Sequence, residues 1–341
     1  MRGQGGLSER ERPTLRDVAD RVGVSVNTAS FVLNGSRSGT RVSPKTRDAL
    51  LSAAVELGYR PNEVARSLQR QRTRLIGLFA QFEHLSAGNA FLSELVGGIQ
   101  EACAELRHDL VLHTIPRDCR TEMLVPSLAD YRIDGLLVFV PEGRELAEAL
   151  ANTHLPAVSL AEPGGSLASV TVDNAKGGEL QAEHLWERGH RRVIYRTWHA
   201  DIPSARTREA AFRGVASRLG MEVVMGRTMW PMDSGDLTDA ERAVLAPPFP
   251  ATAFACWSDD SAQATCATLH RAGLRIPDDV AVVGFDGAAM RYEPRWRLTT
   301  IRAPWREVGA TALRRLYRLI EGDDVIGVER LPVSLVQGAT T

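Results

Sequence analysis

The sequence of 341 residues contains no uninterrupted apolar run near the roughly 18 residues that a membrane-spanning helix requires. Its first residues, MRGQGGLSERERP, also lack the apolar segment of a signal peptide, so we expect a cytoplasmic protein. Cysteine is scarce: Cys103, Cys119, Cys256 and Cys266 are the only four, and none of them are spaced C-x-x-C. This predicts reduced and mostly buried thiols rather than a disulfide framework or a zinc site.

The sequence also lacks the common catalytic signatures. It has no G-x-S-x-G nucleophile turn, no H-E-x-x-H zinc motif and no phosphate-binding P-loop. Three acidic pairs, Asp259-Asp260, Asp278-Asp279 and Asp323-Asp324, fall at predicted helix starts and turns, where carboxylates cap backbone amides. His184 and His190 are too far apart for the i, i+4 pairing of a helical metal site. We therefore expect neither an enzyme nor a bound metal or cofactor.

A net charge of only −1 argues at first against a nucleic-acid partner, but the charge is unevenly distributed. Residues 1–72 contain 13 Lys and Arg against 7 Asp and Glu, a balance of +6, whereas the remainder of the chain carries −7. The near-neutral average therefore conceals a basic N-terminal segment attached to an acidic body.

Three short helices are predicted in the basic segment. The pattern LRDVADRV, residues 15–22, places its apolar residues on one helix face, with Thr14 as N-cap and Gly23 as terminator. A second helix follows Ser25, and Ser43 with the proline after it begins a third. Three helices with a tight glycine turn between the first two predict a helix-turn-helix. The alternative is a packing module without a role in DNA binding.

From Leu75 onward, apolar strands alternate with amphipathic helices, which is typical of parallel sheets covered on both faces. The predicted strands are residues 75–80, 109–114, 134–140, 155–160, 168–172, 191–196, 251–256 and 279–285. The predicted helices lie near residues 91–107, 175–188, 204–219, 258–272 and 304–321. About 265 residues exceed what one core of this kind usually holds, so we expect two similar lobes with a cleft between them.

Several segments carry a family signature: TLRDVADRVGVSVNTASFVLNG (14–35), VSPKTRDALLSAAVELGYRPNEVARSL (42–68), VDNAKGGELQAEHLWERGHRRV (172–193), SARTREAAFRG (204–214), LRIPDDVAVVGFD (274–286) and LTTIRAP (298–304). Together they resemble the lac repressor family (LacI/GalR type) of bacterial transcriptional regulators, from about residue 13 to residue 338. The resemblance implies an all-α helix-turn-helix head and an α/β two-lobed, periplasmic-binding-protein-like body with parallel sheets. It also implies a homodimeric repressor.

The resemblance divides the chain into a tail (1–12), a helix-turn-helix domain (13–60), a hinge helix or linker (61–73) and an effector-binding and dimerisation domain (74–341). One lobe of that domain is expected to comprise 74–172 with 303–332, and the other 173–302 with the C-terminal end. A solute-binding protein would fit the body alone. Such a protein would require a signal peptide and would have no helix-turn-helix. This sequence lacks the signal-peptide pattern and contains a predicted helix-turn-helix.

In a helix-turn-helix the second helix enters the major groove, and the resemblance makes Val26, Asn27 and Phe31 its base-facing residues. Asn27 can pair with an adenine edge, whereas Val26 and Phe31 offer only apolar contact, for example to a thymine methyl group. Phe31 stands where the family often has a polar or basic residue, and the alternative is a core position. The other predicted DNA-binding residues, mostly small donors suited to phosphate oxygens, are Thr14, Ser25, Thr28, Ser30, Asn34, Thr46 and Asn62.

Two further features concern DNA. The resemblance implies that Leu68 from each subunit wedges into the minor groove and bends the duplex; the alternative is a linker residue that packs on the body. The loop Gly35–Arg41 is longer than the family's usual connection, and either adds phosphate contacts or is a flexible insertion. Because each subunit reads half a site, we expect a nearly palindromic operator.

The resemblance assigns an effector site to Arg208 and Asp286, a pair that suits vicinal hydroxyls because a guanidinium donates and a carboxylate accepts. The alternative is a salt bridge between them with no ligand. Trp230 either stacks on a sugar or base or is a buried aromatic residue. Ser258 and Asp259 are expected in the same site, although the family has Asn in place of Ser258.

Phe91 is expected to line the other lobe, and Ala161 stands where a polar residue is common in the family. The expected partners are duplex operator DNA, a small effector for which a carbohydrate is favoured, and a second copy of the chain; no membrane is expected. A sugar would act as inducer and a purine as corepressor, and activation at some promoters is a further alternative. Lobe closure would then change operator affinity through the hinge, with a coupling of typically ~1–3 kcal/mol.

Overall fold

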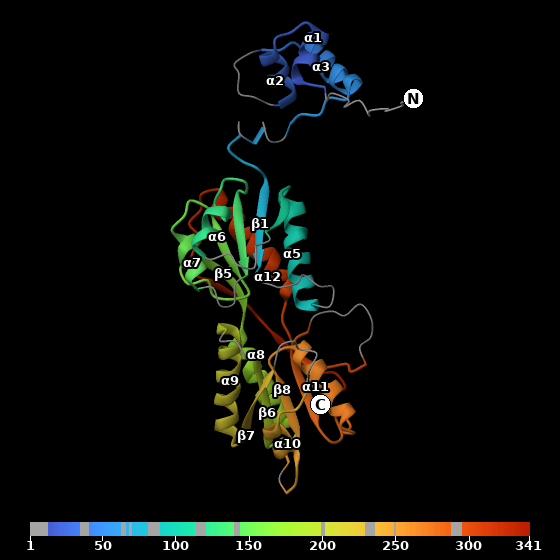
Figure 1. Cartoon of the computed structure of the whole chain (residues 1–341), viewed down its shortest axis with the longest axis vertical. Coiled ribbons are helices and arrows are strands. Elements are labelled where there is room, and N and C mark those ends of the chain that lie inside the picture. The colour runs from blue at the N-terminus through green and yellow to red at the C-terminus, as the bar shows by residue number, and fades with distance from the viewer. Residues whose placement is uncertain are drawn as a thin grey trace, which may run out of the picture. The chain divides into compact units, whose positions relative to one another are not determined.

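The structure, a computed structural model, divides the chain into two compact units, Met1–Arg74 and Leu75–Thr341, which we call the head and the body (Figure 1). It describes residues 13–34, 41–62, 66–67, 70–80, 89–113, 121–139, 144–198, 202–228, 236–248, 250–287 and 295–341. The boundary between the units lies one residue after the predicted one. No helix in the described ranges is long and apolar enough to cross a membrane.

The head contains α1 (Leu15–Val22), α2 (Val26–Asn34) and α3 (Pro44–Leu57). At the start of α1, the Thr14 hydroxyl accepts the N–H of Asp17, and the Asp17 carboxylate accepts the N–H of Thr14. At the start of α3, the Ser43 hydroxyl accepts the N–H of Thr46, and Gly23 and Gly58 end α1 and α3 in the left-handed conformation that favours glycine. The three predicted helices and their caps are therefore confirmed.

The body contains two six-stranded sheets, one in each lobe (Figure 1). The first has the order β2 (Asp109–His113), β1 (Leu75–Ala80), β3 (Gly135–Phe139), β4 (Ala157–Leu160), β5 (Ala168–Val172), β11 (Val328–Leu331), with every neighbouring pair parallel. The second has the order β7 (Glu222–Thr228), β6 (Arg192–Trp198), β8 (Ala253–Cys256), β9 (Ala281–Asp286), β10 (Thr299–Arg302), β12 (Ser334–Val336). Its neighbours are parallel except that β12 runs antiparallel to β10.

The two sheets share one strand order, because β7-β6-β8-β9-β10 repeats β2-β1-β3-β4-β5. This is a doubly wound order, in which ligands bind outside the carboxyl ends of the strands near the point where the order reverses. The chain passes between the lobes after β5, after β10 and after β11. The predicted parallel sheets and paired lobes are confirmed; β7, β10, β11 and β12 were not predicted.

Helices cover both faces of each sheet. On the first sheet, α5 (Ala90–Leu106) and α12 (Trp305–Ile320) pack on one face, and α6 (Thr121–Leu128) and α7 (Arg144–Ala151) on the other. On the second, α8 (Asn174–Glu187) and α9 (Pro203–Leu219) pack on one face, and α10 (Asp239–Leu245) and α11 (Asp259–Arg271) on the other. The predicted helices of the body are present, and α6, α7 and α10 are additional.

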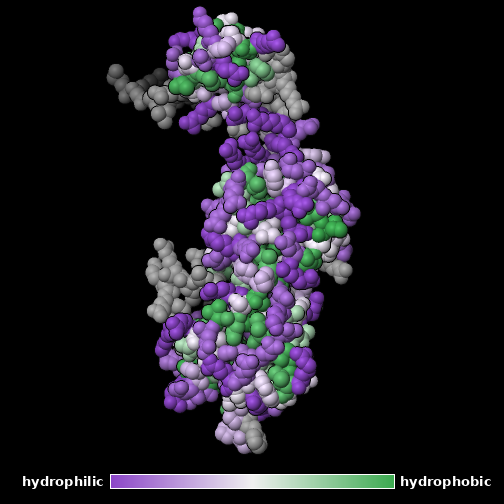
Figure 2. Space-filling model, turned by 180° about the vertical axis from the view of Figure 1, so that it is seen from behind, coloured by the Kyte–Doolittle hydropathy of each residue, from purple (hydrophilic) through white to green (hydrophobic). Residues whose placement is uncertain are grey.

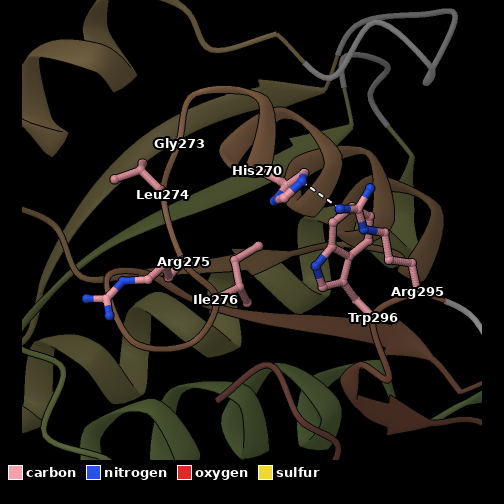
Figure 3. A pocket seen from close by; sticks show the side chains of 7 residues that line it. All are labelled: His270, Gly273, Leu274, Arg275, Ile276, Arg295 and Trp296. Carbon is pink, nitrogen blue, oxygen red and sulfur yellow. Dashed lines mark hydrogen bonds between the residues drawn. The ribbon is translucent and has the colours of Figure 1, made fainter.

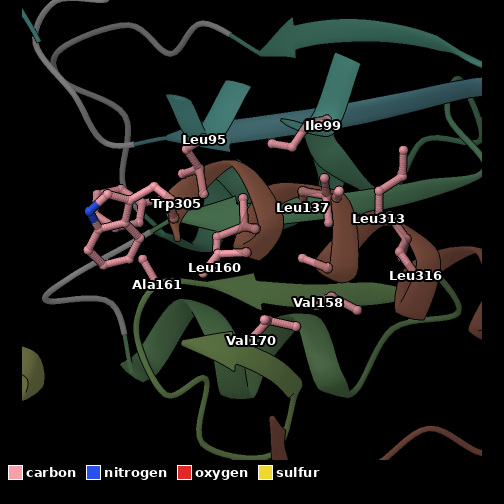
Figure 4. Close-up of a cluster of buried hydrophobic side chains, with 14 of the residues drawn as sticks. Leu95, Ile99, Leu137, Val158, Leu160, Ala161, Val170, Trp305, Leu313 and Leu316 are labelled. Carbon is pink, nitrogen blue, oxygen red and sulfur yellow. The ribbon is translucent and has the colours of Figure 1, made fainter. Parts of the chain in front are cut away.

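Each sheet separates two hydrophobic clusters, because successive side chains of a strand point to opposite faces. In β3, Leu137 and Phe139 belong to the cluster beneath α5 and α12 (Figure 4), whereas Leu136 and Val138 belong to the cluster beneath α6 and α7. Since both faces are covered, the strand is apolar at every position. The uniform apolar runs in the sequence therefore reflect burial on two sides.

Outside these clusters, hydrophilic residues cover most of the face of each unit that Figure 2 shows, and hydrophobic residues occupy separate areas of it. The large hydrophobic residues exposed within the described ranges are Val26, Leu51, Val55, Leu112, Met123, Tyr131, Met225 and Ile326. Val26 belongs to α2, the helix predicted to contact DNA bases.

Candidate nucleic-acid interface and ligand site

The outer face of α2 carries the predicted base-facing residues. Asn27 is exposed, and Val26 is 38% exposed. Phe31 is partly buried. Among the described residues of the head, Val32 and Leu33 pack against the core cluster, and Phe31 does not. Because residues four apart share a helix face, Phe31 lies beside Asn27. The alternative of a core position for Phe31 is therefore not supported.

Most of the predicted phosphate-binding hydroxyls lie at helix starts, where unpaired N–H groups and the helix dipole favour anions. The Ser25 hydroxyl accepts the N–H of Thr28 at 3.1 Å and shares a hydrogen bond with the Thr28 hydroxyl at 2.9 Å. The hydroxyls of Ser43 and Thr46 pair in the same way at 2.8 Å. Thr14 occupies the corresponding place before α1. The first turns of all three helices therefore present hydroxyl groups.

The end of α2 contacts the segment predicted as a hinge. The Asn34 amide donates to the Ser30 hydroxyl at 3.3 Å, and the Asn34 carbonyl accepts from the Arg70 guanidinium at 3.5 Å. The carbonyl of the exposed Asn62 accepts the N–H of Arg66 at 3.1 Å, which is helical spacing at the start of that segment. Leu68 lies outside the described residues, as do residues 35–40 of the loop before α3. Their predicted roles remain predictions.

In the body, Arg208 is held by three groups around its guanidinium. It projects from α9 and is only 3% exposed. Its Nε donates to Asn174 Oδ1 at 2.8 Å, its Nη1 donates to the Trp257 carbonyl at 2.7 Å, and its Cζ lies 3.4 Å from the centroid of the Phe285 ring. Burial lowers the pKa of Arg208, and the nearby Asp286 opposes that effect. The guanidinium is thus held by contacts from the protein itself.

Two partly buried carboxylates lie near Arg208: Asp286 ends β9, and Asp259 begins α11, shortly after β8. Asp286 has a φ of 130°, an uncommon backbone conformation for a residue other than glycine and one that tends to occur at functional sites. Asp259 accepts hydrogen bonds from the Gly287 N–H at 2.8 Å and the Thr300 hydroxyl at 2.6 Å. Burial raises the pKa of Asp259 to about 6 and raises that of Asp286 well above its ordinary value. Ser258, which directly precedes Asp259, is the N-cap of α11.

Arg208 and Asp286 do not form the salt bridge considered as an alternative, although both are described residues. Arg208 instead donates to Asn174 and Trp257, and Asp286 Oδ1 accepts from the Trp305 indole at 3.2 Å. The opposite charges therefore act on one another only through their field. This arrangement leaves a donor group and an acceptor group near one another without mutual neutralisation.

Aromatic residues of the first lobe extend to this site. Trp305 begins α12, and its indole contacts Asp286 of the second lobe. Phe91 of α5 packs edge-on against Trp305, with ring centroids 4.6 Å apart, and lies 5.7 Å from Phe139. Phe91 was predicted here, whereas Trp305 was missed, although it directly follows the LTTIRAP motif. Trp230 lies outside the described residues.

Glu162 is the second residue that sequence reasoning missed. It follows β4 and lies next to Ala161, whose apolar character left this lobe without a polar group. Glu162 Oε2 accepts the N–H of Ser204 at 3.0 Å, and the Ser204 hydroxyl donates to Oε1. The signal was available, because a carboxylate directly behind a buried parallel strand is expected at the ligand-binding edge of the sheet.

The second lobe also contains a surface pocket of about 390 Å³, which Figure 3 shows. It is lined by His270, Gly273, Leu274, Arg275, Ile276, Arg295 and Trp296. Arg295 donates to the His270 ring and lies over the indole of Trp296. None of the predicted effector residues that the structure describes lines this pocket. Within the described ranges, no group of three His, Cys, Asp or Glu is placed to hold a metal ion.

Comparison with known proteins adds sequence and fold relationships. Residues 14–62 match the family described as bacterial regulatory proteins, lacI family, and residues 182–341 match a periplasmic binding protein-like domain. The chain is 31% identical to the HTH-type transcriptional repressor PurR of Photobacterium profundum, over 90% of this chain and 92% of that protein. It is 30% identical to the ribose operon repressor of Escherichia coli, over 90% and 93% respectively. A crystal structure of the lac repressor dimer bound to operator and the anti-inducer ONPF covers 97% of this chain and 99% of that one, with a TM-score of 0.82 and 30% identity.

Proposed function

The chain belongs to the lacI family of bacterial regulatory proteins, and from this premise we propose that it binds a nearly palindromic operator as a homodimer under the control of a small metabolite. It is a DNA-binding transcriptional repressor with an effector-binding domain, not an enzyme. Repressors of this family act in the cytoplasm, where bacterial DNA is located. Dimerisation is supported by the lac repressor, whose structure is that of a dimer on its operator. A two-fold dimer requires matching symmetry in its DNA site.

The observation that supports the DNA-reading surface is the composition of the face that α2 leaves outside the head core. Asn27 provides a bidentate hydrogen-bonding group suited to adenine, and Val26 and Phe31 provide apolar contact beside it. The hydroxyls at the starts of the three helices would fix the head on the phosphates, without reading bases. This pairing of contacts is what sequence-specific binding requires.

The observation that supports effector binding is the buried group around Arg208, to which both lobes contribute. A ligand hydroxyl can accept from the guanidinium and donate to Asp286 or Asp259, which favours a polyhydroxyl compound such as a sugar. A second candidate is a nucleobase, favoured by the aromatic rings of Phe91 and Trp305 beside Asp286, since an aromatic ring can stack on a base. Because the Trp305–Asp286 and Glu162–Ser204 hydrogen bonds join the lobes, a ligand that alters them would change the lobe angle.

A thermal-shift screen of monosaccharides, disaccharides, polyols and nucleobases tests this proposal, repeated on Arg208→Ala and Asp286→Asn. We expect a compound that stabilises the protein and loses its effect in both variants. A stabilising compound that is unaffected by both substitutions would place the effector elsewhere. Operator binding with and without that compound then gives the sign of the coupling: an inducer weakens the complex and a corepressor tightens it.

A further inference from the structure

The N-terminus of α9 is capped by a side chain from the other lobe. Ile202, at its N-cap, has no acceptor in its side chain, and Pro203 at the first position has no N–H. The N–H of Ser204 is therefore the first amide of α9 that needs an acceptor. Glu162 of the first lobe supplies it at 3.0 Å and also accepts the Ser204 hydroxyl. This contact acts on the same helix that carries Arg208.

A tight turn holds Glu162 in place. Ala161 has a positive φ of 61°, the Glu162 N–H donates to the Leu160 carbonyl at 2.7 Å, and the Ser159 hydroxyl donates to the Glu162 carbonyl at 2.9 Å. Glu162 is 4% exposed and Ser204 is 5% exposed. A carboxylate fixed in this way at a buried position is preorganised, rather than one of several conformations of a surface side chain.

Glu162 occupies the position that an anionic ligand would otherwise take. A helix N-terminus attracts anions through its free N–H groups and its dipole. Burial raises the pKa of Glu162, while Ser204, Arg208 and Arg206 lower it, so two guanidinium groups act in the field of this carboxylate. An N-terminal amide, a hydroxyl and two arginines are the usual components of a phosphate or carboxylate site. Here the protein's own carboxylate fills it.

Further carboxylates act on the same arginine. The charges of the partly buried Asp259 and Asp286 act on Arg208, as that of the buried Glu162 does, so three carboxyl groups oppose one buried guanidinium. A ligand phosphate would add negative charge to a region where Asp259 and Asp260 already raise the pKa of Asp286. Hydroxyl or amine groups would instead supply the hydrogen-bond donors that these carboxyl groups accept.

We propose that Glu162 determines the charge selectivity of the effector site, so that the effector is a neutral or cationic compound rich in hydroxyl or amine donors. Effectors that carry a phosphate or carboxylate group are excluded, because Glu162 already neutralises the positive end of α9. This inference rests on the proposed function, in which Arg208 and Asp286 hold an effector. It adds the class of compound and the residue that discriminates.

The test is a titration of the full-length protein with inorganic phosphate, at constant ionic strength maintained with chloride, followed by thermal unfolding. The proteins compared are the wild type, Glu162→Ala, the isosteric Glu162→Gln, and Ser204→Ala as a matched control that removes a hydroxyl but keeps the carboxylate. We expect Glu162→Ala, which frees the Ser204 N–H and removes the carboxylate, to bind phosphate at least tenfold more tightly than the wild type and the Ser204 variant. Glu162→Gln removes the charge but keeps an oxygen on that N–H, so it should bind phosphate more tightly than the wild type and less tightly than Glu162→Ala. The head contributes equally to all four proteins, so the difference reports on α9.

Equal phosphate affinity in the wild type and both Glu162 variants would overturn the proposal. So would a phosphorylated or carboxylated compound that binds the wild type and depends on Arg208. Failure of the proposed function looks different, because the screen then yields no ligand that depends on Arg208, whatever the phosphate titration shows. The isosteric variant guards against misfolding, since glutamine retains an oxygen that accepts the Ser204 N–H.

Discussion

Single residues in this protein combine a structural contact with a chemical one. Glu162 caps a helix and carries charge to the ligand site, and Trp305 packs on Phe91 while it donates to Asp286. Asp259 begins α11 and accepts hydrogen bonds from Gly287 and Thr300. Because burial raises the pKa values of Glu162 and Asp259, the ionisation of these two side chains is coupled to folding.

The partly buried carboxyl of Asp259 should make stability depend on pH. Its pKa is about 6 in the folded protein against an ordinary value of 3.8, with burial as the largest cause. Between these values the folded state keeps a proton that the unfolded state has lost, so the free energy of unfolding falls as pH rises from about 4 to about 6. Above pH 6 the contribution is lost. Asp259→Asn should remove up to about 3 kcal/mol of this pH-dependent change in the free energy of unfolding. Denaturant unfolding across that pH range measures the effect.

The control for this prediction is Asp239→Asn, which changes a fully exposed carboxylate at the start of α10. Its pH profile should follow that of the wild type. A wild-type stability that rises between pH 4 and 6, with the rise abolished by Asp259→Asn, would contradict the assigned direction.

At the scale of elements, the close packing of α8 against α9 positions Arg208. A Cβ atom on Gly178 of α8 would lie 2.2 Å from the Arg208 carbonyl oxygen, a distance that requires the helices to separate. Gly177 meets the Phe285 ring in the same way, at 2.3 Å. Two adjacent glycines thus allow α9 and β9 to approach α8 closely enough to bring Arg208 over Phe285.

We expect Gly178→Ala to destabilise the protein by about 1–3 kcal/mol, because backbone atoms on both helices must shift. Gly214→Ala is the matched control: it lies on α9, and a Cβ there meets nothing within 4 Å. Alanine in that place should be neutral or stabilise by up to ~1 kcal/mol through helix propensity. Denaturant unfolding of both variants measures the difference, and equal effects would show that the close approach is not limiting.

At the scale of the whole molecule, the two units differ in charge. The head, Met1–Arg74, contains 14 Lys and Arg against 7 Asp and Glu, whereas the body contains 27 against 35. The acidic body should be repelled by phosphate, so that only the head contributes to the salt dependence of DNA binding. The head also has its own buried cluster around Val18, Ala29 and Leu50.

A fragment of residues 1–74 should therefore retain weak DNA binding that falls steeply with salt concentration, and a fragment of residues 75–341 should show none. Fluorescence anisotropy with a labelled duplex between about 50 and 200 mM salt measures both. DNA binding by the body fragment, or binding by the head fragment that is insensitive to salt, would refute the assignment of salt-dependent DNA binding to the head alone.

The sequence alone determined those features of this protein that depend on local chemistry. Local hydrogen bonding determines helix caps such as Thr14 and Ser43 and helix ends such as Gly23 and Gly58. Burial on both faces of the sheet determines the strands that are apolar at every position. The family followed from motifs spread over most of the chain. Short or edge elements such as β7, β12 and α10 were missed, because their periodicity is brief and their place depends on neighbours distant in the sequence.

Only the tertiary structure decided which side chains meet. Glu162 and Ser204 are 42 residues apart, and Trp305 reaches Asp286 from a different lobe. No local pattern records such pairings, because they arise when two sheets of the same strand order face each other at their carboxyl ends. The sequence allowed a salt bridge between Arg208 and Asp286. In the folded protein the two side chains have other partners instead: Arg208 donates to Asn174 and Trp257, and Asp286 accepts from Trp305.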